Sequence, residues 1–133
     1  MTERVGTEPS VFTRIIRGEI PGQVLLSTED VVVLRDIAPQ APVHLLVVPR
    51  TEAYADVVQL AAGDPGLLAH MVEVARLAAA QQGATDFRLV FNTGAGAGQT
   101  VFHVHAHVLA SPARDLGEGT MTAGMPDPAE RNS

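Results

Sequence analysis

The sequence predicts an α+β domain with a mainly antiparallel five-stranded sheet, one long helix and a short N-terminal helix. Two observations lead to this class. Segments with helical and strand patterns follow one another in the order helix, three strands, long helix, two strands. The last two strands flank a loop that is too short for a crossover helix, so they must pair antiparallel.

The short helix is predicted at the start of the domain. Ser10 can cap its N-terminus, and Phe12, Ile15 and Ile16 place apolar side chains on one of its faces. Gly18 is expected to end it, because glycine commonly follows the last turn of a helix.

Three strands follow this helix, at residues 23–27, 31–35 and 43–48. Valine and leucine dominate them, and turn-forming residues separate the first two. A proline-rich loop precedes the third strand, and Pro49 closes it. A less regular helical segment is expected to open at Thr51 or Glu52 and to continue around Tyr54.

The long helix has the clearest boundaries. Asp64 is a favoured N-cap, Pro65 suits the first turn, and Gly83 is expected just beyond the C-terminus. Six residues form its apolar face: Leu67, Leu68, Met71, Val74, Ala75 and Ala78. Two strands are predicted after it, at 87–91 and 101–109.

Composition and charge exclude several functional classes. The chain has 133 residues, 46% of them hydrophobic, which suits a single domain with a buried core. It has no cysteine, which excludes disulfides, thiolate metal sites and cysteine catalysis. The 9 Lys+Arg stand against 15 Asp+Glu, and a net charge of −6 argues against broad binding of nucleic acid.

The domain is expected at 10–110, after a flexible N-terminus at 1–9. The C-terminal tail at 111–133 is rich in proline, glycine and acidic residues and is expected to be partly disordered. No apolar run reaches the roughly 18 residues of a membrane helix, and the first residues lack the apolar stretch of a secretory signal. We therefore expect a cytoplasmic protein that binds neither membrane nor nucleic acid.

The strongest chemical signal is a row of three histidines. His103, His105 and His107 alternate with Val104 and Ala106. In a strand, alternate side chains share one face and lie roughly 6.6–6.8 Å apart. Imidazole is costly to bury without partners, so the row requires an explanation.

Three explanations are open. A histidine-lined surface strand fits the strict alternation least well. A metal could bind between the histidines, with His44 from another strand completing the site. One imidazole could instead act as a nucleophile while the others orient it, because histidine is mostly neutral at pH 7.

The loop before the row favours the nucleophile. Gly94, Gly96 and Gly98 alternate with alanine, and such a loop can turn its backbone N–H groups toward one anion. Gln99 and Thr100 follow, directly before the row. Amides, a hydroxyl and imidazoles would bind a phosphate without lysine or arginine, which is compatible with the acidic net charge.

The row and its flanks resemble the histidine-triad (HIT) superfamily of nucleotide hydrolases and transferases. The likeness lies in His-φ-His-φ-His at 103–107 and in Gly-Gln-Thr-Val at 98–101. The segments at 12–21 and 36–44 are similar to two signatures of its Hint-like branch. The resemblance covers nearly all of residues 11–110, and it implies a HIT-like fold, nucleotide binding and a homodimer.

The resemblance also implies catalytic roles. His105 would be the nucleophile that attacks the α-phosphorus of a nucleotide and becomes transiently nucleotidylated. His107 would hydrogen-bond the phosphate or the leaving group. His103 would orient the row, with His44 supporting it.

The substrate-binding residues follow from the same resemblance. Asp36 would accept hydrogen bonds from the ribose hydroxyls. A phosphate site would comprise Asn92, Gly98, Gln99, Thr100 and Val101. An apolar pocket for the purine base would comprise Phe12, Ile15, Leu34 and Ile37.

Two departures from the family pattern matter. Many bacterial relatives carry two cysteines near the first helix that bind a structural zinc together with histidines, and Ser10 and Thr13 stand there in this chain. We therefore predict neither a metal nor a cofactor. The Hint-like branch tends to end in a Trp-Pro-Pro-Gly-like tail, whereas this chain has no tryptophan. The preferred leaving group is therefore the least defined part of the expected activity.

The resulting hypothesis is a hydrolase of the adenosine 5′-monophosphoramidase type. It would cleave purine nucleoside 5′-monophosphate derivatives (AMP or GMP type) at the α-phosphorus through a covalent nucleotidyl-histidine. The alternatives are a dinucleoside polyphosphate hydrolase and a nucleotide-binding module without a catalytic role.

Overall fold

The structure is a computed structural model that describes residues 8–112. Most of the predicted flexible N-terminus at 1–9 and of the predicted tail at 111–133 lies outside the described residues. The helices are α1 (Val11–Ile16), α2 (Val57–Gly63) and α3 (Pro65–Gln81), with a short 3-10 helix at Ala95–Ala97. The strands are β1 (Val24–Ser27), β2 (Val31–Arg35), β3 (Val43–Pro49), β4 (Arg88–Val90) and β5 (Ala106–Ala110).

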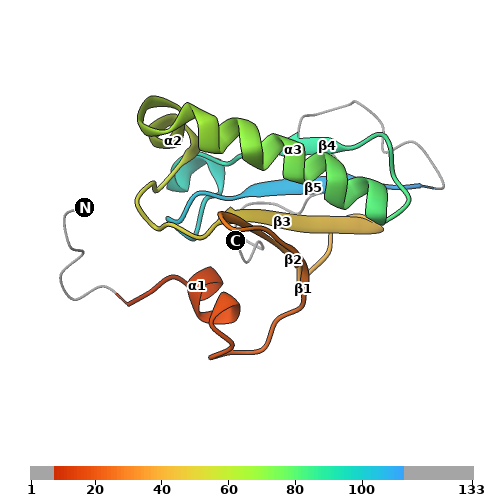
Figure 1. Cartoon of the computed structure of the whole chain (residues 1–133), viewed down its shortest axis with the longest axis horizontal. Coiled ribbons are helices and arrows are strands. Elements are labelled where there is room, and N and C mark those ends of the chain that lie inside the picture. The colour runs from red at the N-terminus through yellow and green to blue at the C-terminus, as the bar shows by residue number, and fades with distance from the viewer. Residues whose placement is uncertain (1–7, 113–133) are drawn as a thin grey trace.

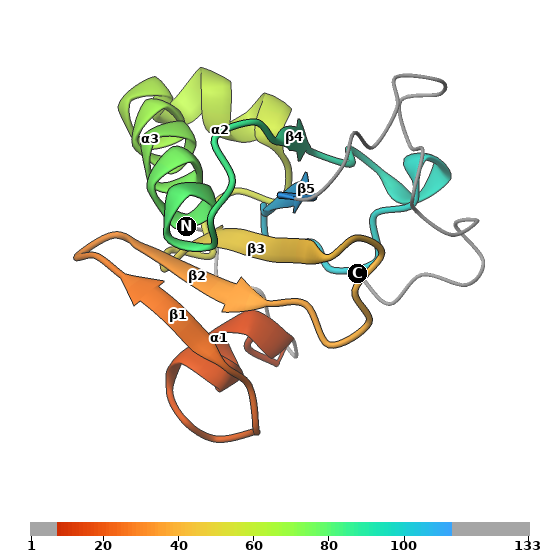
Figure 2. The same cartoon turned by 90° about the vertical axis from the view of Figure 1, so that its right-hand side faces the viewer.

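The five strands form one sheet in the order β1-β2-β3-β5-β4, and every neighbouring pair is antiparallel. This arrangement confirms the predicted α+β class, the sheet, the long helix and the short N-terminal helix. Figure 1 shows α3 along one face of the sheet and α1 beneath the other. Figure 2 shows the same layers from the side, with α2 beside α3.

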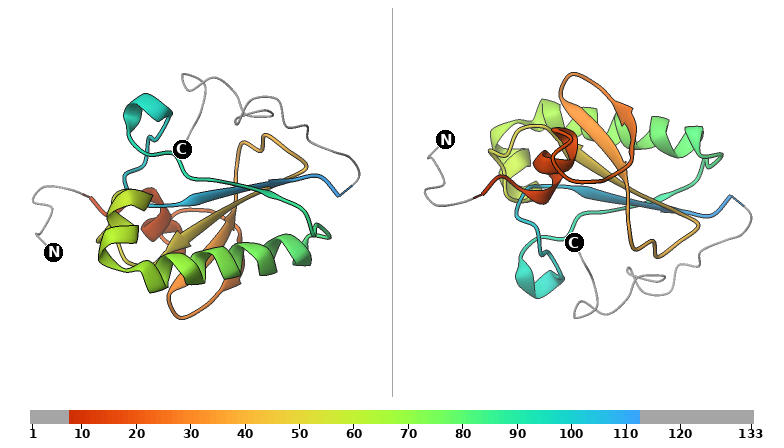
Figure 3. Two further views of the ribbon diagram at one scale, coloured as in Figure 1. Left: turned by 90° about the horizontal axis from the view of Figure 1, so that it is seen from above. Right: turned by 90° about the horizontal axis from the view of Figure 1, so that it is seen from below.

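The alternation of side chains along β3 divides the core in two. Val43, Leu45 and Val47 pack with Met71 and Val74 of α3 in the larger core. The smaller core, called the α1-side core here, consists of Phe12, Val32, Leu34, Leu46 and Val48. Seen from above and below, α3 and α1 cross the strands on opposite faces (Figure 3). His44 lies two residues before Leu46 in β3, so its side chain is on the same face of the sheet as α1.

The predicted helix ends are confirmed. Ser10 and Asp64 cap α1 and α3, each accepting a hydrogen bond from a backbone N–H of the first turn. Gly18 and Gly83, which follow these helices, have φ angles of 79° and 85°, a region that favours glycine. No helix within residues 8–112 is both long and apolar enough to span a membrane.

The helical segment predicted around Tyr54 is wrong, because α2 begins only at Val57. Asp56 caps this helix by accepting a hydrogen bond from the backbone N–H of Gln59. The chain before it is a loop whose backbone makes a tertiary contact. The carbonyl of Tyr54 accepts a hydrogen bond from the N–H of Val104 at 3.0 Å.

The last strand also starts later than predicted, at Ala106 rather than residue 101. Ala106 still pairs with β3, but β3 ends two residues beyond this pair, at Pro49. Proline has no N–H to continue a ladder. Its carbonyl oxygen lies 2.7 Å from Nε2 of the His103 ring instead. Of the three histidines in the row, only His107 therefore belongs to the strand.

Candidate active site

The predicted catalytic histidines gather on the α1 face of the sheet. His44 lies in β3 and His107 in β5, two strands that pair directly. His103 and His105 lie in the irregular segment just before β5. None of the four side chains is more than 4% exposed. Buried imidazoles need hydrogen-bond partners for their ring nitrogens, and these partners define the site.

His44 connects the row to an acid. Its Nε2 atom lies 3.0 Å from Nδ1 of His107 and 3.2 Å from Oδ2 of Asp36. Its other ring nitrogen, Nδ1, accepts a hydrogen bond from the backbone N–H of Gln40 at 2.9 Å. A neutral imidazole that accepts at Nδ1 carries its proton on Nε2. His44 is therefore a donor, and its proton is shared between His107 and Asp36.

The tautomer of His107 follows from this contact. Its Nδ1 faces the donor on His44, so Nδ1 accepts and the proton of His107 lies on Nε2. The resemblance had assigned His44 to the support of His103. The structure places His44 against His107 instead, with ring centroids 5.2 Å apart, because the two residues lie on paired strands. His103 lies at the other end of β3, beside Pro49.

Backbone carbonyls determine the tautomers of the other two histidines. Nδ1 of His105 lies 2.9 Å from the carbonyl oxygen of His103, and Nε2 of His103 lies 2.7 Å from that of Pro49. A carbonyl oxygen can only accept, so these two ring nitrogens carry the protons. His105 therefore has its lone pair on Nε2, the atom through which an imidazole can attack.

Phe12 of α1 packs against the row from the side. Its ring makes edge contacts with His105 and His103, with centroids 4.8 Å and 5.8 Å apart. His105 and His107 make a similar contact at 5.2 Å. Such geometry is favourable for aromatic rings and restricts their orientation. Phe12, predicted only as a wall of a base pocket, also contacts the histidines directly.

A buried glutamine shapes the glycine loop. Oε1 of Gln99 accepts a hydrogen bond from the N–H of Gly94 at 2.8 Å. Its Nε2 donates to the carbonyls of Ala55 and Val101 at 2.7 Å and 3.0 Å. Gly98 has a φ of 97°, where a side chain would be strained. Gln99 was predicted to bind substrate, but in the structure its side chain hydrogen-bonds to backbone groups and stabilises the loop.

The other predicted substrate residues differ in exposure. Leu34 is buried in the α1-side core, and Ile15 packs against it. Asn92 is half-buried and Thr100 is exposed at the end of the glycine loop. Ile37 is 83% exposed. If it lines a base pocket, the bound base would have to cover its side chain. Their roles toward a nucleotide stay predictions.

Two acids make contacts that the sequence analysis missed. Asp36 was assigned to a ribose, but its Oδ1 accepts a hydrogen bond from the N–H of Ala38 at 2.8 Å and its Oδ2 faces His44. The short loop between two antiparallel strands could have indicated that pairing. Glu52 accepts a hydrogen bond from the N–H of Ser10, a contact across 42 residues that no local pattern indicates.

Asp36, His44 and His107 form the one group of three potential metal ligands found within residues 8–112, with ligand atoms within 4.8 Å of one another. Hydrogen bonds already explain this cluster. To bind a metal through Nε2, His44 would have to lose the proton that its contact with Gln40 places there. The geometry therefore favours the nucleophile over the metal hypothesis for this row.

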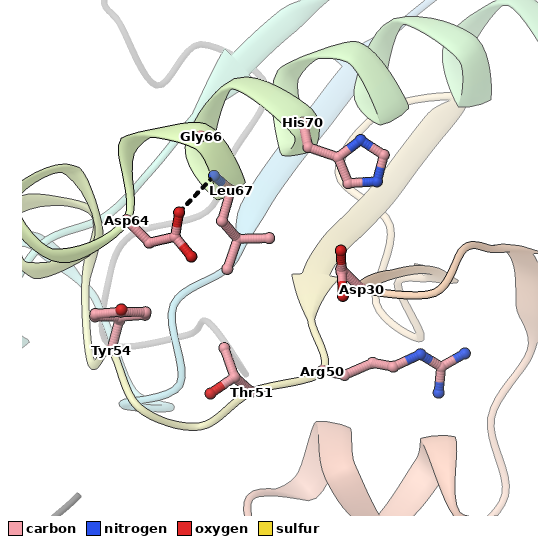
Figure 4. Close-up of a pocket in the computed structure, with 8 residues that line it drawn as sticks. All are labelled: Asp30, Arg50, Thr51, Tyr54, Asp64, Gly66, Leu67 and His70. Atoms are coloured by element: carbon pink, nitrogen blue, oxygen red, sulfur yellow. Dashed lines mark hydrogen bonds between the residues drawn. The ribbon is translucent and has the colours of Figure 1, made fainter.

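A separate cavity lies between the start of α3 and the loop after β3 (Figure 4). It is lined by Asp30, Arg50, Thr51, Tyr54, Asp64, Gly66, Leu67 and His70. The guanidinium of Arg50 donates hydrogen bonds to Ser27 and Thr28 in and after β1, at 2.6 Å and 3.2 Å. None of the predicted site residues lines this cavity, so it is not part of the histidine site.

Comparisons with known proteins agree with this geometry. A family model described as "Scavenger mRNA decapping enzyme C-term binding" matches residues 9–122. An uncharacterized HIT-like protein of Synechococcus elongatus is 41% identical over 104 residues, which cover 77% of this chain and 90% of that protein. The chain belongs to the histidine-triad (HIT) family. The purine nucleoside phosphoramidase of Escherichia coli K12 is 38% identical to this HIT protein over 112 residues, 83% and 92% of the two chains.

Solved structures support the same assignment. A HIT family hydrolase from Legionella pneumophila has a TM-score of 0.75 at 35% identity, and the match covers 84% of this HIT protein and 98% of that chain. A HIT family hydrolase from Clostridium thermocellum has a TM-score of 0.78 at 34% identity, with coverage of 86% and 98%. These relatives confirm the HIT fold, and they assign the HIT protein to the family's hydrolases.

One maize relative, 35% identical over 108 residues, is named "14 kDa zinc-binding protein". Ser10 and Thr13 of this HIT protein do not fit a structural zinc. Their hydroxyls are neutral and hydrogen-bonded, to His103 and Glu52 respectively. Structural zinc sites use four thiolate, imidazole or carboxylate ligands. Of these four residues, only His103 and Glu52 have such a group. We assign no chemical step to a metal here.

We expect each histidine of the site to show one tautomer in ¹⁵N NMR spectra. His44, His103 and His107 should carry the proton on Nε2 and His105 on Nδ1, because the partners described above admit only that arrangement. Long-range ¹H–¹⁵N correlation spectra of the imidazole rings near pH 8 measure this. His70 on α3, outside the site, provides the reference. A proton on Nε2 of His105 would contradict the geometry.

Proposed function

We propose that this HIT protein is a nucleotide phosphoramidase that cleaves purine nucleoside 5′-monophosphate derivatives at the α-phosphorus. The observation that carries the proposal is the tautomer of His105. Its Nδ1 donates to the carbonyl of His103, so Nε2 carries the lone pair that would attack phosphorus. The name of the E. coli relative, purine nucleoside phosphoramidase, supports the same substrate class.

The reaction would proceed in two displacements at phosphorus. In the first, Nε2 of His105 forms a bond to the α-phosphorus, the P–N bond to the leaving amine breaks, and the amine departs with a proton taken from water. In the second, water forms a P–O bond, the bond between phosphorus and His105 breaks, and the nucleoside monophosphate is released with a proton passing to solvent. Two smaller barriers thus replace one large barrier.

Neutral donors would stabilise the charge on the phosphoryl oxygens. His107 would donate its Nε2 proton to one oxygen. The backbone N–H groups near Gly98 and Val101, the hydroxyl of Thr100 and the amide of Asn92 would surround the others. Such fixed donors are effective because they need no reorganisation during the reaction.

The nucleoside would lie beside α1. Phe12, Ile15, Leu34 and Ile37 would contact the purine base, and Asp36 would accept hydrogen bonds from the ribose hydroxyls. A carboxylate has about four lone-pair sites, and two are directed at Ala38 and His44. Asp36 therefore keeps acceptor capacity for a ribose.

We further propose a homodimer in the cytoplasm that requires neither nucleic acid nor membrane. β4 lies at an edge of the sheet and is only half-buried. Val72 and Leu77 of α3 are 43% and 41% exposed. A second copy that covers this edge and helix would remove unpaired backbone groups and apolar surface from water.

Replacing His105 with alanine should lower turnover by about 10³-fold or more, because no other group can form the covalent intermediate. Rapid quenching with an AMP phosphoramidate, followed by intact mass measurement, should show a transient AMP adduct on the wild-type protein that maps to residues 101–109. His70→Ala is the control and should keep both the adduct and the rate. Unchanged turnover in His105→Ala would exclude the proposed nucleophile.

An AMP phosphoramidate should be a better substrate than a diadenosine polyphosphate, by about tenfold or more in kcat/KM. The proposed phosphate site has only neutral donors and lies near Asp36, which disfavours a polyanionic chain. Initial rates with both substrates measure this. Faster cleavage of the polyphosphate would favour the dinucleoside polyphosphate hydrolase. Nucleotide binding without turnover of either would favour the non-catalytic binding module.

Light scattering should give a mass of twice the 14.0 kDa of one chain. Leu77→Asp should shift the protein toward the monomer, because a charge would then face the proposed interface. Val58→Asp on α2 is the matched control, since Val58 is 65% exposed and belongs to neither α3 nor β4, the two elements of the proposed interface. A wild-type protein that stays monomeric at high concentration would contradict the dimer.

A further inference from the structure

We propose that Ser10, Thr13 and Glu52 form a positioning network that holds His103 and, through it, the nucleophile His105. This inference rests on the proposed function, since the position of His105 affects a rate only if its ring attacks phosphorus. The three residues are positioning residues, because their contacts are with His103, with each other and with backbone groups.

The network joins α1 to the loop after β3. Oε2 of Glu52 accepts a hydrogen bond from the backbone N–H of Ser10 at 3.0 Å and another from the hydroxyl of Thr13. Oγ of Ser10 accepts a hydrogen bond from the backbone N–H of Thr13 at 3.1 Å. The carboxylate of Glu52 thus binds two residues at the start of α1, and the hydroxyl oxygen of Ser10 caps the first turn of that helix.

The hydroxyl of Ser10 has two possible acceptors, Oγ1 of Thr13 at 3.4 Å and Nδ1 of His103, and the contact with His103 is much the shorter. The carbonyl of Pro49 places a proton on Nε2 of His103, and in the neutral ring Nδ1 can then only accept. Oγ of Ser10 lies 2.6 Å from this Nδ1 and is therefore the donor. Both ring nitrogens of a fully buried imidazole are thus hydrogen-bonded. The His103 ring can turn only by breaking two buried hydrogen bonds, which is costly.

Two routes lead from this network to His105. The first runs through the backbone of His103, whose carbonyl accepts a hydrogen bond from Nδ1 of His105 at 2.9 Å. The second is Phe12, which lies between Ser10 and Thr13 in sequence and packs against both histidine rings. α1 has only six residues, too few for a stable isolated helix. Its contacts with Glu52 and His103 therefore hold the ring of Phe12 together with the packing of the α1-side core.

Ser10→Ala and Glu52→Ala test the network, with Ser10→Thr and Glu52→Gln as conservative partners that keep the hydroxyl donor and the oxygen acceptor. We expect each alanine variant to lower kcat for an AMP phosphoramidate by about tenfold to a hundredfold with KM changed less than about threefold. The conservative variants should recover most of the rate. Thr51→Ala, beside Glu52, is the matched control, because its exposed hydroxyl accepts only a local hydrogen bond from Ala53.

Ring ¹⁵N spectra provide a readout that does not depend on turnover. Ser10→Ala should shift the signals of His103 and His105 and leave those of His44 and His107 in place. Urea unfolding gives the folded fraction of each variant, so that rates refer to folded protein.

The network is excluded if both alanine variants keep kcat within about twofold of the wild type. It is also excluded if their losses match the unfolded fraction while the His105 signals stay unchanged. If the wild type hydrolyses no phosphoramidate but Ser10→Ala still shifts the His105 signals, the positioning stands and the proposed function fails.

Discussion

The hydrogen bond between the His103 imidazole and the carbonyl oxygen of Pro49 is the contact on which the site depends. Pro49 ends β3, and its missing N–H stops the ladder to β5. The same residue leaves a carbonyl that binds the His103 ring. This bond holds the segment before β5 together with the hydrogen bond from Val104 to Tyr54. It also defines which nitrogen of His103 carries the proton and why Ser10 is the donor on the other side of the ring.

A second chain of hydrogen bonds reaches the site from the opposite end of β3. It begins at the backbone N–H of Gln40, passes through His44 and ends at His107. Both chains therefore begin at main-chain groups, one donor and one acceptor, which do not titrate. The complementary tautomers of His105 and His107, a lone pair on one Nε2 and a proton on the other, follow from hydrogen bonds that start at the backbone.

Most of the fold could be predicted from local patterns. The long helix shows its own ends in Asp64 and Gly83, and the valine-rich strands lie where their composition indicates. The gathering of the histidines followed from alternation and from the family resemblance. The start of β5 could not be predicted locally, because Pro49 decides it from more than 50 residues away. The role of Gln99 likewise depends on Ala55, 44 positions earlier, and Glu52 was mistaken for the start of a helix.

The two-sided character of β3 restricts how this domain can vary. Val43, Leu45 and Val47 belong to the core under α3, whereas His44, Leu46 and Val48 have the opposite parity. Sliding β3 by one position against its neighbours would bury an imidazole among valines and put a valine at the reaction centre. If one residue were inserted or deleted in the 36–42 loop, β3 could not compensate by shifting one position. A shift of two positions would keep each side chain on its face of the sheet. The packing of the core and the chemistry of the site thus depend on the same property of β3, namely which residues occupy its odd and its even positions.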